Sequence, residues 1–126
     1  MERKKSILKI KSEAYAVRII NLHKYLRTDK HETIMSKQIY RSGTSIGANI
    51  AESTNAQSGF GFINKLSIAL KEANETEYWL KNLYQGEYIN KVGFESMMND
   101  NEELTKMLVS SIKTMKQKMG IDDTTR

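Results

Sequence analysis

The chain of 126 residues contains no proline, no cysteine and only one tryptophan. Because proline removes a backbone donor and clashes with the preceding turn, its absence allows long helices to run unbroken. The lack of cysteine excludes disulfide bonds, thiolate metal ligands and a cysteine nucleophile, and it fits a reducing cytoplasm. Long apolar runs are also missing, since Lys9, Lys11 and Glu13 interrupt the first apolar stretch. We therefore expect a cytoplasmic protein with no signal peptide and no membrane partner.

Positive charge is concentrated at the beginning of the chain. The formal net charge is +5, and residues 1–30 contain nine lysines and arginines against three acidic residues. Cations on a helix can neutralise phosphates and release counterions, and no sequence pattern for reading bases is present. We therefore predict non-specific binding of RNA or DNA by the first helix; the alternative is an ordinary solvated face. The predicted binding residues are Arg3, Lys4, Lys5, Lys9, Lys11, Arg18, Lys24, Arg27 and Lys30.

Four segments have the spacing of apolar residues that is typical of amphipathic helices. The expected helices cover residues 3–27, 32–57, 62–84 and 91–119. Four helices of similar length joined by short loops pack as antiparallel neighbours. The sequence therefore predicts an all-α, antiparallel up-down-up-down four-helix bundle. We expect one domain over residues 1–120 and a polar tail over residues 121–126.

The spacing also predicts which side chains face the core. In the first segment the main stripe is Ile7, Ile10, Ala14, Val17, Asn21 and Tyr25, widened by Leu8, Tyr15, Ile19, Leu22 and Leu26. In the third it is Phe62, Leu66, Ala69, Ala73, Thr76, Leu80 and Leu83, and in the fourth Phe94, Met97, Asn101, Leu104, Leu108, Ile112, Met115 and Met119. Gly59 and Gly61 are expected to separate the second and third helices, because glycine is unfavourable inside a helix. Gly86 and Asn90 are the expected caps of the third and fourth helices.

The second helix contains a row of small residues. Gly43, Gly47 and Ala51 recur every four residues, which lets a neighbouring backbone approach closely. Read literally, residues 43–47 also match the G-x-S-x-G pattern of serine hydrolases. That pattern needs a strand before it and a histidine later in the chain, whereas both histidines precede Gly43. We reject the hydrolase reading.

Two helices carry unusual side chains on the face that is not expected to pack in the core. Short and mixed polar residues on the second helix, and a tryptophan and an isoleucine among carboxylates on the third, are typical of an interface. We therefore predict that this face joins copies of the chain into a homo-oligomer. Its residues are Arg41, Ser45, Ala48, Asn49, Glu52, Ile68, Glu72, Glu75 and Trp79. Ion pairs of Arg41 with Glu52 or Glu75 would set the register of the contact.

No group of residues indicates catalysis. A di-metal site in a helical bundle needs a Glu-x-x-His motif, and this chain contains none. Glu52, Glu72 and Glu75 have no nucleophile, histidine or phosphate-binding loop beside them in the sequence. We expect no enzymatic activity, no metal and no cofactor.

The run Ser45-Ile46-Gly47-Ala48-Asn49-Ile50-Ala51-Glu52 resembles the S-I-P-A-N-I-A-E-G signature of the bacterial family of 23S rRNA intervening-sequence proteins. The likeness continues through residues 62–69, Glu75 and residues 104–112. The resemblance implies a four-helix bundle that assembles as a homopentamer. In a related branch, the accessory variability determinant of diversity-generating retroelements, the pentamer binds nucleic acid and a reverse transcriptase.

The chain departs from the family pattern at several positions. Gly47 stands where the signature has proline, Ser53 stands where it has glycine, and residues 71–72 replace a pair of small residues. The leading hypothesis is a non-catalytic homo-oligomer that binds RNA or DNA and has a nucleic-acid-processing protein as a further partner. The alternative is a scaffold for a protein partner, with no role for nucleic acid.

Overall fold

The computed structural model describes residues 6–121 and contains four helices over that range. The helices are α1 (Ile7–Thr28), α2 (Met35–Ser53), α3 (Gly59–Gln85) and α4 (Lys91–Lys118). Within residues 6–121 there is no strand. The prediction of an all-α bundle is confirmed.

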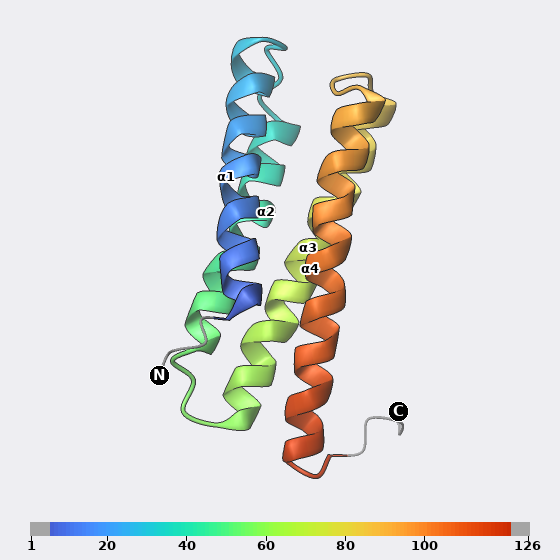
Figure 1. Ribbon diagram of the computed structural model, residues 1–126. Helices are drawn as coiled ribbons and strands as arrows, with labels where there is room; N and C mark the ends of the chain where they lie inside the picture. The colour runs from blue at the N-terminus through green and yellow to red at the C-terminus, as the bar shows by residue number, and fades with distance from the viewer. Residues whose placement is uncertain (1–5, 122–126) are drawn as a thin grey trace.

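Consecutive helices run in opposite directions, as Figure 1 shows. Each helix packs against its neighbours in the chain, and α1 also contacts α4, which closes the bundle. The α1–α4 contact is the least extensive of the four. One end of the bundle is formed by the α1–α2 and α3–α4 turns, and the other end contains the α2–α3 turn.

The core matches the expected stripes of the third and fourth helices. Leu66, Leu80 and Leu83 of α3 are fully buried. Leu108 of α4 is also fully buried, and Leu104 is 1% exposed. Burial of these side chains, together with the apolar residues that α1 and α2 contribute to the same core, supplies the main favourable free energy of the fold.

The stripe expected on α1 is wrong. Ile7, Ile10 and Val17 are 62%, 48% and 55% exposed, and α1 turns its second set of residues to the core instead. The buried residues of α1 are Leu8, Ser12, Tyr15, Ile19 and Leu26. Both sets repeat at helical spacing, so periodicity alone cannot select between them. Contact with α2 determines which set is buried, because Ile19 lies against Gly43 and Ser12 faces Gly47.

The start of α2 differs from the prediction because a carboxylate ends the preceding turn. Glu32 is buried, and its two carboxylate oxygens accept hydrogen bonds from the backbone N–H groups of Ile34, Met35 and Ser36 at 3.1, 2.9 and 2.7 Å. A negative charge is favourable at the N-terminus of a helix, where these N–H groups have no partner within the helix. Helix α2 therefore begins at Met35 and not at Glu32.

The start of α3 corrects a second expectation. Gly59 and Gly61 lie in the first turn of α3 and do not separate it from α2. The Ser58 hydroxyl caps the helix by accepting a hydrogen bond from the Gly61 N–H at 3.0 Å. The expected caps are confirmed at the other turn, where Gly86 ends α3 and the Asn90 side chain accepts from the Gly93 N–H at 2.8 Å.

Candidate functional site

The predicted basic residues of the first helix differ in whether they have acidic partners. Arg3, Lys4 and Lys5 lie outside the described residues. Three others have acidic partners: Lys9 lies 3.5 Å from Glu13, Lys11 lies 3.1 Å from Glu103, and Arg18 lies 2.7 Å from Asp100. Arg18 also donates to the Ser96 hydroxyl at 2.9 Å and so links α1 to α4. These three cations are thus partly neutralised before any ligand arrives.

The last two turns of α1 and the loop turn that follows them contain the remaining three predicted cations. Lys24, Arg27 and Lys30 are all exposed, and none has an acidic partner among residues 6–121. Their spacing of three residues places them on successive turns at one end of the bundle. Of the predicted set, these are the described cations with most freedom to contact an anion.

A second group of cations lies on α4, outside the predicted set of binding residues. Residues 104–118 contain four lysines and no acidic residue, and Lys106, Lys113 and Lys118 are exposed. The acidic residues of α3 and of the first half of α4 balance this local excess when the charges of residues 31–126 are summed. A shorter window would have found it.

The predicted interface residues follow α2 and α3, which pack against each other. The Arg41 guanidinium lies 2.6 Å from Glu75 and 3.3 Å from Glu72 Oε1. The two oxygens of Glu72 differ: Oε1 lies within ion-pair distance of Arg41 but accepts no hydrogen bond. Oε2 accepts a hydrogen bond from the Arg41 guanidinium at 3.4 Å. Of the two pairings expected for Arg41, the one with Glu75 is present, within a single chain.

The carboxylate of Glu75 also accepts a hydrogen bond from the Trp79 indole N–H at 3.1 Å. The hydrogen bond from Arg41 is the main cause of a lowered pKa of Glu75, and the bond from Trp79 adds to it. Trp79 is therefore held in one orientation, half-buried, on the surface of α3.

Elsewhere among the predicted interface residues, Glu52 of α2 forms an ion pair with Lys65 of α3 at 2.7 Å and not with Arg41. The Asn49 amide donates to the Ser45 carbonyl at 2.9 Å, so its polar group is satisfied within α2. Ala48 is exposed and Ile68 is half-buried. The α2–α3 face, defined as the nine predicted interface residues, has short side chains on α2 between the two ion-paired residues Arg41 and Glu52.

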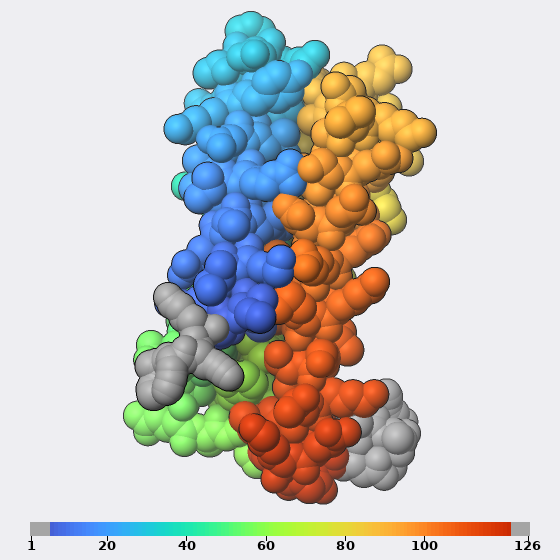
Figure 2. Space-filling model, in the orientation of Figure 1, coloured from blue at the N-terminus to red at the C-terminus, as the bar shows by residue number. Residues whose placement is uncertain are grey.

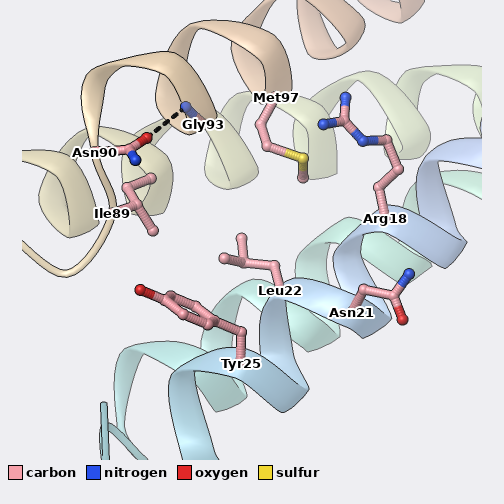
Figure 3. A pocket seen from close by; sticks show the side chains of 8 residues that line it. All are labelled: Arg18, Asn21, Leu22, Tyr25, Ile89, Asn90, Gly93 and Met97. Atoms are coloured by element: carbon pink, nitrogen blue, oxygen red, sulfur yellow. Dashed lines mark hydrogen bonds between the residues drawn. The ribbon is translucent and has the colours of Figure 1, made fainter. Parts of the chain in front are cut away.

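A groove between α1 and α4 was not foreseen. It has a volume of about 450 Å³ and is lined by Leu22, Ile89 and Met97, with Tyr25 at one end. Figure 3 shows Leu22 and Tyr25 extending from α1 towards Ile89 and Met97, with open space between the two helices. The groove exists because α1 and α4 pack less closely than the other pairs. No local sequence signal reports such a difference.

A second cavity lies at the end of the bundle, between the α1–α2 turn and the α3–α4 turn. Its volume is about 390 Å³, and three tyrosines line it together with Lys30 and Glu87. The tyrosines are Tyr25, Tyr84 and Tyr88. Figure 2 shows this end of the molecule divided between the light-blue and yellow turns. Tyr25 belongs to both cavities, so they adjoin.

The core contains one polar connection between α1 and α4. The Tyr15 hydroxyl donates to the Met97 carbonyl at 3.3 Å and accepts from the Asn101 amide at 3.2 Å. Burial raises the pKa of Tyr15 well above its ordinary value, so the hydroxyl stays neutral. The side-chain oxygen of Asn101 is buried without a hydrogen-bond partner. We assign this connection to the fold and not to a binding site.

Over residues 6–121, no group of three or more histidine, aspartate or glutamate side chains is arranged to hold a metal ion. Of the four helices, none combines the length and the apolar character that crossing a bilayer requires.

Comparison with known proteins shows similarity to a protein family and to a solved structure. The model of the family described as 23S rRNA-intervening sequence protein matches residues 4–110. A crystal structure from Bacteroides thetaiotaomicron VPI-5482, described as a protein with unknown function from the S23 ribosomal protein family, is 59% identical in sequence with a TM-score of 0.84. The match covers 85% of this chain and 99% of that one. No curated protein matched the chain.

Proposed function

Because the chain belongs to the family of 23S rRNA-intervening sequence proteins, we propose that it is a non-catalytic accessory protein that assembles with itself and binds RNA or DNA. Binding is non-specific and uses the cations of α1. The place of action is the cytoplasm, with a nucleic-acid-processing protein as a further partner. The observation that carries the proposal is the group of three exposed cations, Lys24, Arg27 and Lys30, that lack acidic partners among the described residues.

Self-assembly would strengthen a contact that is weak in one copy. Three cations in a single chain give modest, salt-sensitive affinity for a polyanion. Repeated around a closed ring, the same cations engage one strand several times, and the effective concentration of each further contact rises. The family resemblance supports a ring of five. The α2–α3 face is the proposed surface of assembly, because Arg41 and Glu75 hold Trp79 in place there.

Fluorescence anisotropy of labelled RNA and DNA, titrated with protein at several salt concentrations, tests the nucleic-acid role. We expect affinity to fall as salt rises, with a logarithmic slope of about 0.7–0.9 per phosphate contact. The variant Lys24→Gln/Arg27→Gln/Lys30→Gln should lose most of the affinity and of the slope. A second variant, with glutamine at Lys4, Lys5, Lys9 and Lys11, measures the contribution of the other end of the basic set.

The matched control is Lys71→Gln/Lys106→Gln/Lys113→Gln, which removes three exposed cations of α3 and α4 that form no ion pair among the described residues. If this control loses as much affinity as the first variant, net charge and not the position on α1 determines binding. If the unmodified protein binds no oligonucleotide even at low salt, the nucleic-acid role is wrong.

Light scattering tests the assembly. We expect a mass corresponding to several copies, and a lower mass for Trp79→Ala, because truncation of a large side chain at the centre of an interface weakens it most. Val109→Ala, at an exposed position of α4, is the control and should keep the parent mass. A parent protein with the mass of one chain would contradict self-assembly.

A scaffold for a protein partner is the second candidate, and the outer face of α1 favours it. Ile7, Ile10 and Val17 are about half exposed or more and lie on one side of the helix. Contiguous apolar surface of this kind is typical of protein contacts, and phosphate binding does not require it. Retained assembly without nucleic-acid binding in the experiments above would leave this candidate as the better account.

A further inference from the structure

The cavity at the end of the bundle gathers half of the tyrosines in the chain. The sequence contains six tyrosines, and Tyr25, Tyr84 and Tyr88 all line this one cavity. They come from three different places, namely the last turns of α1, the last turn of α3 and the α3–α4 turn. Tertiary structure and not local sequence therefore brings them together.

Tyr25 offers an exposed flat surface, whereas one face of Tyr84 is covered by Phe94. Tyr84 is stacked on Phe94, with ring centroids 4.5 Å apart and planes inclined by 10°, so its orientation is set by the α3–α4 packing. Tyr25 is 39% exposed at the rim that the cavity shares with the α1–α4 groove. Figure 3 shows its ring extending away from α1 into that open space. An aromatic ring so placed can stack with another flat, unsaturated ring.

Charge around the cavity is asymmetric. Lys30 is the one cation among the lining residues, and it has no acidic partner among the described residues. Glu87, on the opposite turn, is the one carboxylate among the lining residues. An anion is therefore attracted to the α1 side of the cavity and repelled from the α3–α4 side.

We propose that this cavity binds an unpaired nucleobase, which stacks on tyrosine while its phosphate contacts Lys30, so that the protein prefers single-stranded to double-stranded nucleic acid. The inference rests on the proposed nucleic-acid role. It adds to that role a preference for single strands and a location for the contact. Stacking platforms beside cations are the general means of binding single strands without sequence preference. In a duplex the bases are already stacked and paired, so their faces cannot reach Tyr25.

Other occupants fit the lining less well. The volume of about 390 Å³ lies within the range of about 300–1,000 Å³ that is typical of small-ligand sites. An apolar peptide segment would cover the charges of Lys30 and Glu87 without pairing them, which is unfavourable. A nucleotide supplies both the flat ring and the negative charge that the cavity is arranged to receive.

Anisotropy with three labelled probes tests the inference: a 12-nucleotide oligo(dT), a 12-nucleotide oligo(U) and a 12-base-pair DNA duplex, all at one salt concentration. We expect the single strands to bind about tenfold more tightly than the duplex. Oligo(dT) and oligo(U) should bind similarly, because stacking and phosphate contacts are common to DNA and RNA. The variant Tyr25→Ala should lower single-strand affinity about tenfold and leave duplex affinity unchanged.

Two further variants separate stacking from other effects. Tyr25→Phe keeps the ring and should bind single strands like the parent, and Glu87→Gln should bind more tightly because it removes the repelling charge. Thermal unfolding of each variant verifies that the fold is retained. Equal affinity for duplex and single strand, or an unchanged affinity in Tyr25→Ala, overturns the inference but leaves the proposed function standing. Absence of binding to every probe at low salt overturns both.

Discussion

Gly43 of α2 lies directly against Ile19 of α1, so that a Cβ atom at position 43 would stand 2.6 Å from Ile19 Cγ1. Real Cβ atoms essentially never come that close to another heavy atom. The second glycine of the row is less confined: a Cβ atom at Gly47 would lie 3.5 Å from the Ser12 carbonyl oxygen, an ordinary contact distance. The spacing along α2 predicts the same role for both glycines, and the structure places the tight contact at Gly43.

The two alanine substitutions should therefore have opposite effects on stability. Alanine is favoured over glycine inside a helix by about 1 kcal/mol. We expect Gly47→Ala to be neutral or stabilising by up to that amount. In Gly43→Ala the displacement of the buried Ile19 outweighs this gain, and we expect a net loss of about 1–3 kcal/mol. Urea unfolding followed by circular dichroism, at one protein concentration, measures both; equal stabilities would contradict the packing described here.

Removing one partner of the buried hydrogen bond between Tyr15 and Asn101 should destabilise the fold. Tyr15→Phe leaves the buried Asn101 amide without its acceptor, and we expect a loss of about 1–3 kcal/mol in the free energy of unfolding. The double variant Tyr15→Phe/Asn101→Leu removes both polar groups and should regain a large part of that loss. The comparison uses thermal or urea unfolding of the single and double variants. If the losses of Tyr15→Phe and Asn101→Leu simply add in the double variant, the hydrogen bond contributes nothing to stability.

The buried carboxylate of Glu32 should be important for the start of α2. Glu32→Ala leaves three backbone N–H groups without their acceptor, and we expect a loss of about 1–2 kcal/mol. Glu102→Ala, at an exposed position of α4, removes the same charge and should change stability by less than about 0.5 kcal/mol. Unfolding of both variants is measured side by side. Hydrogen exchange of the Ser36 amide should increase in Glu32→Ala alone.

The contact between Arg41 and Glu75 predicts a specific dependence on pH. Because the pKa of Glu75 is lowered in the folded protein, its contribution to stability is present above its ordinary value of about 4.3 and is lost as the pH falls through the lowered value. We expect Glu75→Gln to be less stable than the parent at pH 7, by no more than about 1 kcal/mol, since the pair is partly exposed.

The measurement is the melting temperature of the parent and of Glu75→Gln over a range of pH. The difference between them should disappear at acid pH, where the group at position 75 is uncharged in both proteins. The matched control is Glu102→Gln, which removes a charge far in sequence from Arg41. A difference between Glu75→Gln and the parent that persisted unchanged at low pH would show that lost packing, and not the ion pair with Arg41, is the cause.

Local patterns were sufficient to predict four helices, the core faces of α3 and α4 and the caps at Gly86 and Asn90. These follow from short-range physics: helical periodicity, and the few side chains that can satisfy the backbone groups at a helix end. Arg41 and Glu75 could be named as a pair because both lie on the polar faces of adjacent helices.

Packing between helices determined what those patterns left open. Helix α1 is apolar on two sides, so the choice between the Ile7–Ile10–Val17 side and the Tyr15–Ile19 side depended on which one fits the glycines of α2. Whether Lys11 and Arg18 are free depended on Glu103 and Asp100, which are distant in sequence. The tyrosine cavity likewise requires three separate segments to meet. Such features depend on distances between elements, and the spacing of residues along one element carries no information about them.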